Sequence, residues 1–198
     1  MDTSLEKVAK GAFFLYLSYV MGTVLGYVYW FAISRISGPE VLGVASTTAS
    51  LATLILTIAC LGISTGAQRF LGRAVGNKDM NSFRAYLSVE VTITGLATCF
   101  AASLLLVLSD ELNIYVGLPK VYILITALMV IARGIVLALR TAYISTVETK
   151  QLAVAEISGS VVRIPVGVAL VALGIGSLGA TLGYFTLYLI TLVILAIS

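Results

Sequence analysis

The sequence contains six long apolar runs separated by short polar connections. The runs cover residues 11–34, 41–67, 85–109, 121–144, 152–173 and 177–197. About 20 apolar residues suffice for a helix to cross a bilayer, whereas the strands of a membrane barrel have only ~9–11. The chain is 60% hydrophobic and 11% charged, and soluble domains carry roughly 25% charged residues. We therefore predict an all-α integral membrane protein, with residues 1–198 forming one up-down bundle of six transmembrane helices.

The basic residues alternate between the two ends of this predicted bundle. The N-terminal segment and the second and fourth connections lie on one side of the predicted bundle. Their basic residues are Lys7, Lys10, Arg69, Arg73, Lys78, Arg84, Arg140 and Lys150. The first and third connections hold only Arg35 and Lys120. Cytoplasmic segments of membrane proteins are enriched in Lys and Arg. The N-terminus and, after six crossings, the C-terminus are therefore predicted to face the cytoplasm from a multi-pass position in the cell membrane.

The last apolar run ends the sequence at LVILAIS without a basic flank. We expect the natural protein to continue beyond this point, so that the chain is one part of a larger transporter. The alternative is a complete half-size protein whose sixth helix ends flush with the membrane. Near the opposite end of the first run, Tyr27, Tyr29 and Trp30 are predicted to form an aromatic anchor at the outer interface.

Five charged residues lie inside the apolar runs, where each charge costs at least ~2.5–3.5 kcal/mol to insert. They are Glu90, Arg133, Arg140, Glu156 and Arg163. With a rise of about 1.5 Å per residue, Arg140 and Glu156 both lie within about 10 Å of the cytoplasmic surface and are predicted to pair. Arg133 and Arg163 both lie roughly 18 Å deep, near the midplane, without an acidic partner at that depth. They predict an anion-binding site, the alternative being buried ion pairs that hold helices together.

The second apolar run carries hydroxyl side chains at helical spacing, a pattern that predicts the wall of a hydrated cavity. The set continues inward as far as the start of the second connection, and comprises Ser46, Ser50, Thr53, Thr57, Ser64 and Gln68. The alternative is ordinary packing, because Ser and Thr are common between membrane helices. The spacings Gly22–Gly26 and Gly179–Gly183 are predicted to be close helix contacts.

The residues of soluble-enzyme chemistry are missing from the sequence. Histidine is absent, and Cys60 and Cys99 each lie in an apolar run without a neighbour at metal-ligand spacing. The glycine-rich LGIGSLGA follows a membrane run and not a strand, so it is not a phosphate-binding loop. We therefore expect no enzymatic activity, no cofactor, no metal and no nucleic-acid partner. Glu90 and Glu156 are the intramembrane carboxylates available for a coupling ion.

The stretch ISRISGPEVLGVASTTASLATLILTIACLGISTGAQRFLGRAVGNKD, residues 33–79, resembles polysaccharide (O-antigen type) flippases of the MOP exporter superfamily. The matching features are Arg35 with the Gly-Pro-Glu turn after it, Gly43, and GISTGAQR ending at Arg69. SLEKVAKGAFF at the N-terminus is similar to the lead-in of that family. The later runs agree in number and loop length but carry no specific motif.

This resemblance implies two six-helix lobes related by a pseudo-twofold axis along the membrane normal, rocking around a central site. The chain would be the N-terminal lobe, with a missing C-terminal lobe or a second copy as partner. The implied substrate is an oligosaccharide on a polyprenyl (pyro)phosphate, moved from the cytoplasmic to the outer leaflet for cell-surface glycan assembly. By matched position, Arg35 and Arg69 would be contacts or gates at the ends of the lobe.

Three alternatives to a flippase remain at this point. A multidrug cation antiporter of the same superfamily would need acidic residues in the cavity, and the first run has no charge between Lys10 and Arg35. A membrane-embedded enzyme of lipid-linked sugars would need carboxylate or histidine clusters at the membrane edge. A six-helix structural or channel subunit that dimerises would require a complete gene of this length.

Overall fold

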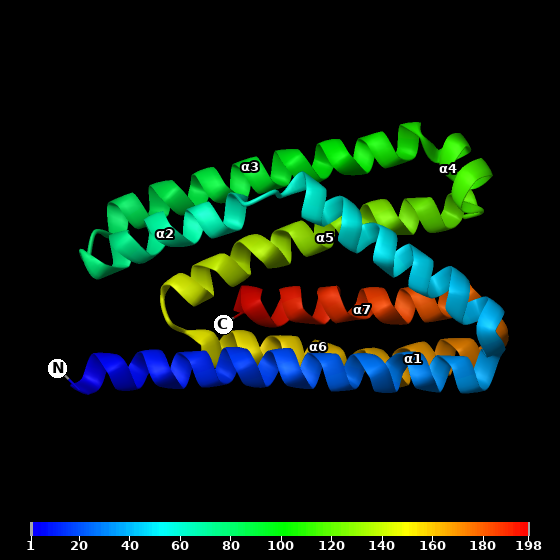
Figure 1. Cartoon of the computed structure of the whole chain (residues 1–198), viewed down its shortest axis with the longest axis horizontal. Helices are drawn as coiled ribbons and strands as arrows, with labels where there is room; N and C mark the ends of the chain where they lie inside the picture. Colours follow the sequence, from blue (N-terminus) through cyan, green and yellow to red (C-terminus); the bar gives the residue numbers. More distant parts are fainter. Residues whose placement is uncertain (1, 198) are drawn as a thin grey trace.

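The computed structural model describes residues 2–197, and side chains from Glu6 onward. Within this range the chain is helical and contains no strand: α1 (Asp2–Ala59), α2 (Ile63–Gly76), α3 (Met80–Val107), α4 (Ser109–Val116), α5 (Lys120–Ser145), α6 (Thr149–Leu170), the π-helical η1 (Val171–Ile175) and α7 (Gly176–Ile197). Figure 1 shows the first part of α1 beside α6 and α7 in one layer and α2, α3 and α5 in another, with the later part of α1 crossing from the first layer to the second.

Helix α1 is two helical arms joined at Gly38. The φ angle of Gly38 is 79°, a left-handed value that glycine adopts without steric penalty, and Pro39 then begins the next helical turn. The chain reverses direction here: the first arm (residues 2–37) lies along α6, and the second arm (residues 39–59) returns diagonally toward α2 (Figure 1). The predicted runs 11–34 and 41–67 begin on these two arms.

The second arm ends earlier than the sequence predicts. A continuous helix was expected to Ala67, but the arm stops at Ala59, and Gly62 has a left-handed φ of 73° before α2 starts. Ser64 and Gln68 therefore lie on a separate helix, α2, and do not extend the hydroxyl face of the second arm.

The connection between α6 and α7 also turns at glycine, whereas the α2–α3 and α5–α6 turns have their left-handed φ at Lys78 and Val147. Gly174 and Gly176 have φ angles of 84° and 61°, and α7 returns antiparallel to α6. α3 and α5 contain most or all of the predicted runs 85–109 and 121–144, but the connection between them is not an open loop, because residues 109–116 form the short helix α4.

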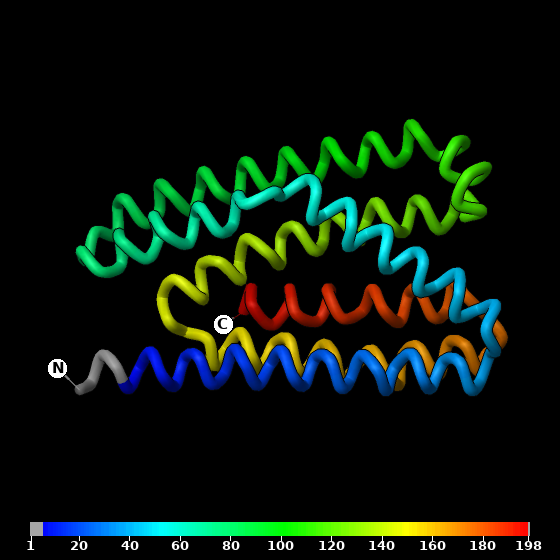
Figure 2. Tube along the Cα trace, viewed as in Figure 1, coloured from blue at the N-terminus to red at the C-terminus, as the bar shows by residue number. Residues whose placement is uncertain are grey.

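Four helical stretches are long and apolar enough to cross a membrane: Glu6–Ala59, Met80–Val107, Lys120–Ser145 and Thr149–Ile197. The first and last contain the reversals at Gly38 and at Gly174–Gly176. Both termini, the α2–α3 turn and the α5–α6 turn lie at one end of the molecule, and the α1 reversal and α4 lie at the other (Figure 2). The chain is thus an all-helical, multi-pass membrane protein.

Helices α6 and α7 approach each other most closely at glycines. A Cβ on Gly183 would collide with the Gly167 backbone, and one on Gly159 would lie 2.6 Å from the Leu187 carbonyl oxygen. Close packing at Gly179–Gly183 is therefore confirmed. The same prediction was wrong for Gly22, which has no neighbouring atom within 4 Å of a Cβ position, because it borders a cavity.

Candidate functional site

A cavity of about 320 Å³ lies between the first arm of α1 and helices α5, α6 and α7. Its apolar wall includes Leu56 of the second arm and Val136, Leu137 and Leu187. Its polar wall collects charges from two helices and hydroxyls from three, and consists of Ser18, Arg133, Arg140, Glu156, Ser160, Arg163, Tyr184, Tyr188 and Thr191. Four of the five charged residues predicted inside the membrane therefore meet in one cavity.

Arg163 is the most deeply buried of the cavity arginines, with 3% of its surface exposed. Its guanidinium carbon lies 5.3 Å from the ring centre of Tyr29 and 5.1 Å from that of Tyr184. Gly26 leaves room for it, since a Cβ there would lie 3.2 Å from Nη2. Aromatic faces attract a guanidinium, but they accept no strong hydrogen bond, and Nε has no hydrogen-bond partner. The side chain is thus held in place with hydrogen-bonding capacity unused.

Arg133 reaches the same cavity from the middle of α5. Its guanidinium carbon lies 5.1 Å from the ring centre of Tyr188, and Nη1 donates a hydrogen bond to the Thr53 hydroxyl on the second arm of α1. The described residues give it no carboxylate partner within ion-pair distance. Arg133 therefore links the cavity to the hydroxyl-bearing face of the second arm.

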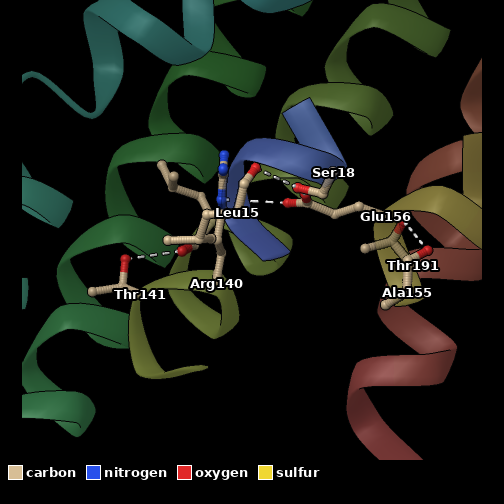
Figure 3. A network of polar contacts seen from close by, with 8 residues as sticks. Leu15, Ser18, Arg140, Thr141, Ala155, Glu156 and Thr191 are labelled. Carbon is tan, nitrogen blue, oxygen red and sulfur yellow. Dashed lines mark hydrogen bonds and ion pairs between the residues drawn. The ribbon is translucent and has the colours of Figure 1, made fainter. Parts of the chain in front are cut away.

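Arg140 and Glu156 form the predicted pair across α5 and α6, with Nε 3.3 Å from Oε1 (Figure 3). The other carboxylate oxygen accepts a hydrogen bond of 2.7 Å from the Ser18 hydroxyl on the first arm of α1. Glu156 thus ties three helices together at the rim of the cavity. Its side chain is 23% exposed and that of Arg140 41%, so the pair is partly solvated.

The cavity wall carries three guanidinium groups and one carboxylate. Charges in a low-dielectric surrounding interact much more strongly than in water, and unpaired guanidinium groups bind carboxylate or phosphate by charge-assisted hydrogen bonds. The cavity is suited to an anionic group with hydroxyl-bearing neighbours.

The hydroxyl residues of the second arm lie beside this cavity and do not form its wall. Ser50, Thr53 and Thr57 are exposed and Ser46 partly so. Three of these hydroxyls donate hydrogen bonds to backbone carbonyls one turn earlier in the same helix. They belong to Ser46, Thr53 and Thr57. Only Thr53 contacts a cavity residue, through Arg133. The exposed face continues the polar surface outward from the cavity.

Arg35 and Arg69 also lie outside the cavity wall. Arg35 is exposed just before the α1 reversal, with its guanidinium 5.3 Å from the ring centre of Phe31. Arg69 is exposed on α2. The structure therefore does not bring these two arginines together with Arg133, Arg140 and Arg163.

Glu90 of α3 is buried away from the cavity, with 2% of its surface exposed. Neither carboxylate oxygen has a hydrogen-bond partner among the described residues. The hydroxyls of Ser64 on α2 and Thr141 on α5 lie near the carboxyl group, and the Thr141 hydroxyl proton is already donated to the Leu137 carbonyl. Glu90 is therefore a buried acid that has no cationic partner among the described residues.

The sequence pattern did not reveal the aromatic part of the site. Tyr29 was predicted to anchor at the membrane interface, which is wrong: it is fully buried and donates its hydroxyl to the Ala180 carbonyl. Trp30 stacks on Tyr184 with ring centres 5.3 Å apart, whereas Tyr27 is 71% exposed, as an anchor would be. The spacing of Tyr184 and Tyr188, one helical turn apart in an aliphatic run, was the available signal.

The fold defines an all-helical, multi-pass membrane protein with a charged cavity between its helices. A family model described as MatE matches residues 15–169, which include all the charged cavity residues. The chain belongs to the MatE family, whose members are transporters of the MOP superfamily. No curated protein and no solved structure matches the chain.

Proposed function

We propose that the chain forms one lobe of a flippase that moves a lipid-linked oligosaccharide from the cytoplasmic to the outer leaflet. The observation that carries this proposal is the cavity with three arginines and a single carboxylate. A polyprenyl phosphate or pyrophosphate supplies the matching negative charge, and its sugar supplies hydroxyls. Membership of a transporter family supports the class of function, and the charge of the cavity supports the class of substrate.

The proposed topology has six crossings, with the reversals at Gly38 and at Gly174–Gly176 on the outer side. The distribution of charge supports it, because the end that holds both termini also holds the basic α2–α3 and α5–α6 turns (Figure 1). Both termini then lie in the cytoplasm, and the protein resides in the cell membrane.

In the proposed mechanism Arg133 and Arg163 bind the phosphate near the midplane, after Arg140 has met it at the cytoplasmic rim. The hydroxyls of the second arm face the sugar. A second lobe, supplied by a C-terminal half or by a second copy of the chain, closes the other side, and the isoprenoid tail stays in lipid between the lobes. Arg35 and Arg69 act as contacts at the two ends of the lobe.

The principal rival is a cation antiporter of the same superfamily. Glu156 is the only carboxylate in the cavity wall, and Arg140 and Ser18 already engage it. A cationic drug would therefore meet two guanidinium groups without a free counter-charge. A structural or channel subunit has no specific observation in its favour.

The substrate class is tested with the wild-type chain in proteoliposomes and three fluorescent probes. One is a short polyprenyl pyrophosphoryl disaccharide, the second is the same disaccharide on an uncharged polyprenyl ether, and the third is ethidium. We expect flipping of the first probe only. Equal flipping of the charged and uncharged lipids would contradict phosphate binding by the cavity arginines. Transport of ethidium alone would favour the cation antiporter.

Glu90 is the proposed site of ion coupling, because its carboxyl group is buried without a cationic partner among the described residues. The change Glu90→Gln removes the buried acid, so we expect equal or higher thermal stability. Transport should continue down a substrate gradient but lose its response to an imposed proton or sodium gradient. Stability is read from thermal melting in detergent, and coupling from flipping with and without each gradient. If Glu90→Gln responds to a gradient as the wild type does, Glu90 is not the residue that couples transport to the ion.

A further inference from the structure

The turn between α2 and α3 forms a basic hairpin, defined here as residues 69–86. It carries four exposed cations, on Arg69, Arg73, Lys78 and Arg84. The ion pairs of the described residues are Lys10–Glu6, Lys120–Asp110 and Arg140–Glu156, so none of the four is paired. The hairpin therefore presents a cluster of uncompensated positive charge.

The single acidic residue of the hairpin does not neutralise these cations. Asp79 caps α3 by accepting hydrogen bonds from the Ser82 amide at 3.1 Å and from the Ser82 hydroxyl at 2.6 Å. These bonds hold the pKa of the Asp79 carboxyl below its ordinary value. Its carboxylate is committed to the cap, and the hairpin keeps an excess of positive charge.

Exposed apolar side chains accompany the cations. Phe70 and Tyr86 are 54% and 43% exposed, and their ring centres lie 5.6 Å apart, so the pair bridges α2 and α3. Further along α3 the exposed residues become aliphatic, with Val89, Val91 and Ile93. Aromatic residues between a basic surface and an aliphatic one are typical of the level of lipid headgroups.

The opposite end of the molecule carries fewer cations without an ion pair. There Lys120 pairs with Asp110 at 2.7 Å, and Arg35 lies over the ring of Phe31. The asymmetry concentrates unpaired charge on one membrane interface, beside exposed aromatic rings.

We propose that the basic hairpin binds the headgroup of an anionic phospholipid of the bilayer. Arg69 and Arg73 lie one helical turn apart on α2, a spacing at which both guanidinium groups reach one phosphodiester. Arg84 and Lys78 add long-range attraction, and the Phe70–Tyr86 pair packs on the upper part of the acyl chains. The ligand is a bilayer phospholipid and not the transported substrate, because Arg69 and Arg73 lie outside the cavity wall.

The test is native mass spectrometry of the full chain in detergent, with dioleoyl phosphatidylglycerol and dioleoyl phosphatidylcholine as probes. The wild type should retain phosphatidylglycerol preferentially, and raised salt should reduce this preference. The double variant Arg69→Gln/Arg73→Gln should bind phosphatidylglycerol about 30-fold more weakly, because each lost cation weakens binding to an anionic lipid by about fivefold to sixfold. Both side chains are exposed, so its melting temperature in phosphatidylcholine should match the wild type.

The matched control is Arg35→Gln/Lys120→Gln, which removes two cations from the other end and should leave phosphatidylglycerol binding unchanged. Equal affinity of the wild type for both lipids overturns the proposal. The proposal is also overturned if the Arg69/Arg73 variant binds phosphatidylglycerol as tightly as the wild type does, or if the control loses as much affinity as that variant. Displacement of the lipid by equimolar inorganic phosphate would assign the hairpin to a free anion instead.

Discussion

Replacing Arg163 with methionine is expected to lower flipping of the pyrophosphoryl lipid by about 10- to 100-fold, the value of one or two charge-assisted hydrogen bonds to a buried anion. The folded state should be at least as stable as the wild type. Arg163 is 3% exposed without a carboxylate partner, and methionine of similar length removes the burial of an unpaired charge. A loss of transport without a loss of stability separates anion binding from packing.

The measurement is the flipping rate in proteoliposomes beside the melting temperature in detergent. Arg163→Lys is the informative companion, because lysine keeps the charge but loses the planar face that lies against Tyr29 and Tyr184. It should retain part of the activity. Lys120→Gln, on the far interface, is the control and should flip at the wild-type rate. Wild-type flipping by Arg163→Met would remove the anion site from the proposed mechanism.

The change Gly183→Val is expected to destabilise the fold by at least ~1–3 kcal/mol, the usual cost of overpacking. A side chain there would collide with the Gly167 backbone and lie 3.0 Å from the Tyr29 hydroxyl oxygen, so α6 and α7 must separate. Thermal melting in detergent measures the effect. Gly95→Val is the matched control, since nothing lies within 4 Å of its Cβ position, and it should melt close to the wild type. Equal melting of the two variants would contradict the close approach of α6 and α7.

The positions of the helices were largely predicted from the apolar runs, because a chain that crosses lipid must form its backbone hydrogen bonds internally, as a helix does. The turns at Gly38 and Gly174–Gly176 lie in the predicted first and fifth connections. The break before α2 was not predicted, because Gly62 interrupts a run whose composition does not change. Helix α4 was also missed, because its polar residues are typical of a connection.

The charged part of the candidate site was also predicted from spacing. Arg140 and Glu156 lie equally deep on consecutive helices, and the structure pairs them. The tyrosines around Arg163 and Arg133 were not predicted, because they come from α1 and α7, and contacts between distant segments leave no periodic signal. The hydroxyl set was recognised as a helical face, but its position outside the cavity wall depends on how the second arm crosses the layers.

The charge of the cavity wall has an electrical consequence. Three guanidinium groups against one carboxylate leave two positive charges uncompensated. Moving one elementary charge across the whole membrane changes its electrical free energy by about 2.3 kcal/mol per 100 mV of membrane potential. In the proposed function, the doubly negative pyrophosphate of the substrate neutralises the wall, so the loaded transporter alternates between the two faces with little electrical work. The empty transporter keeps its two fixed charges, and its return is then the step that senses voltage.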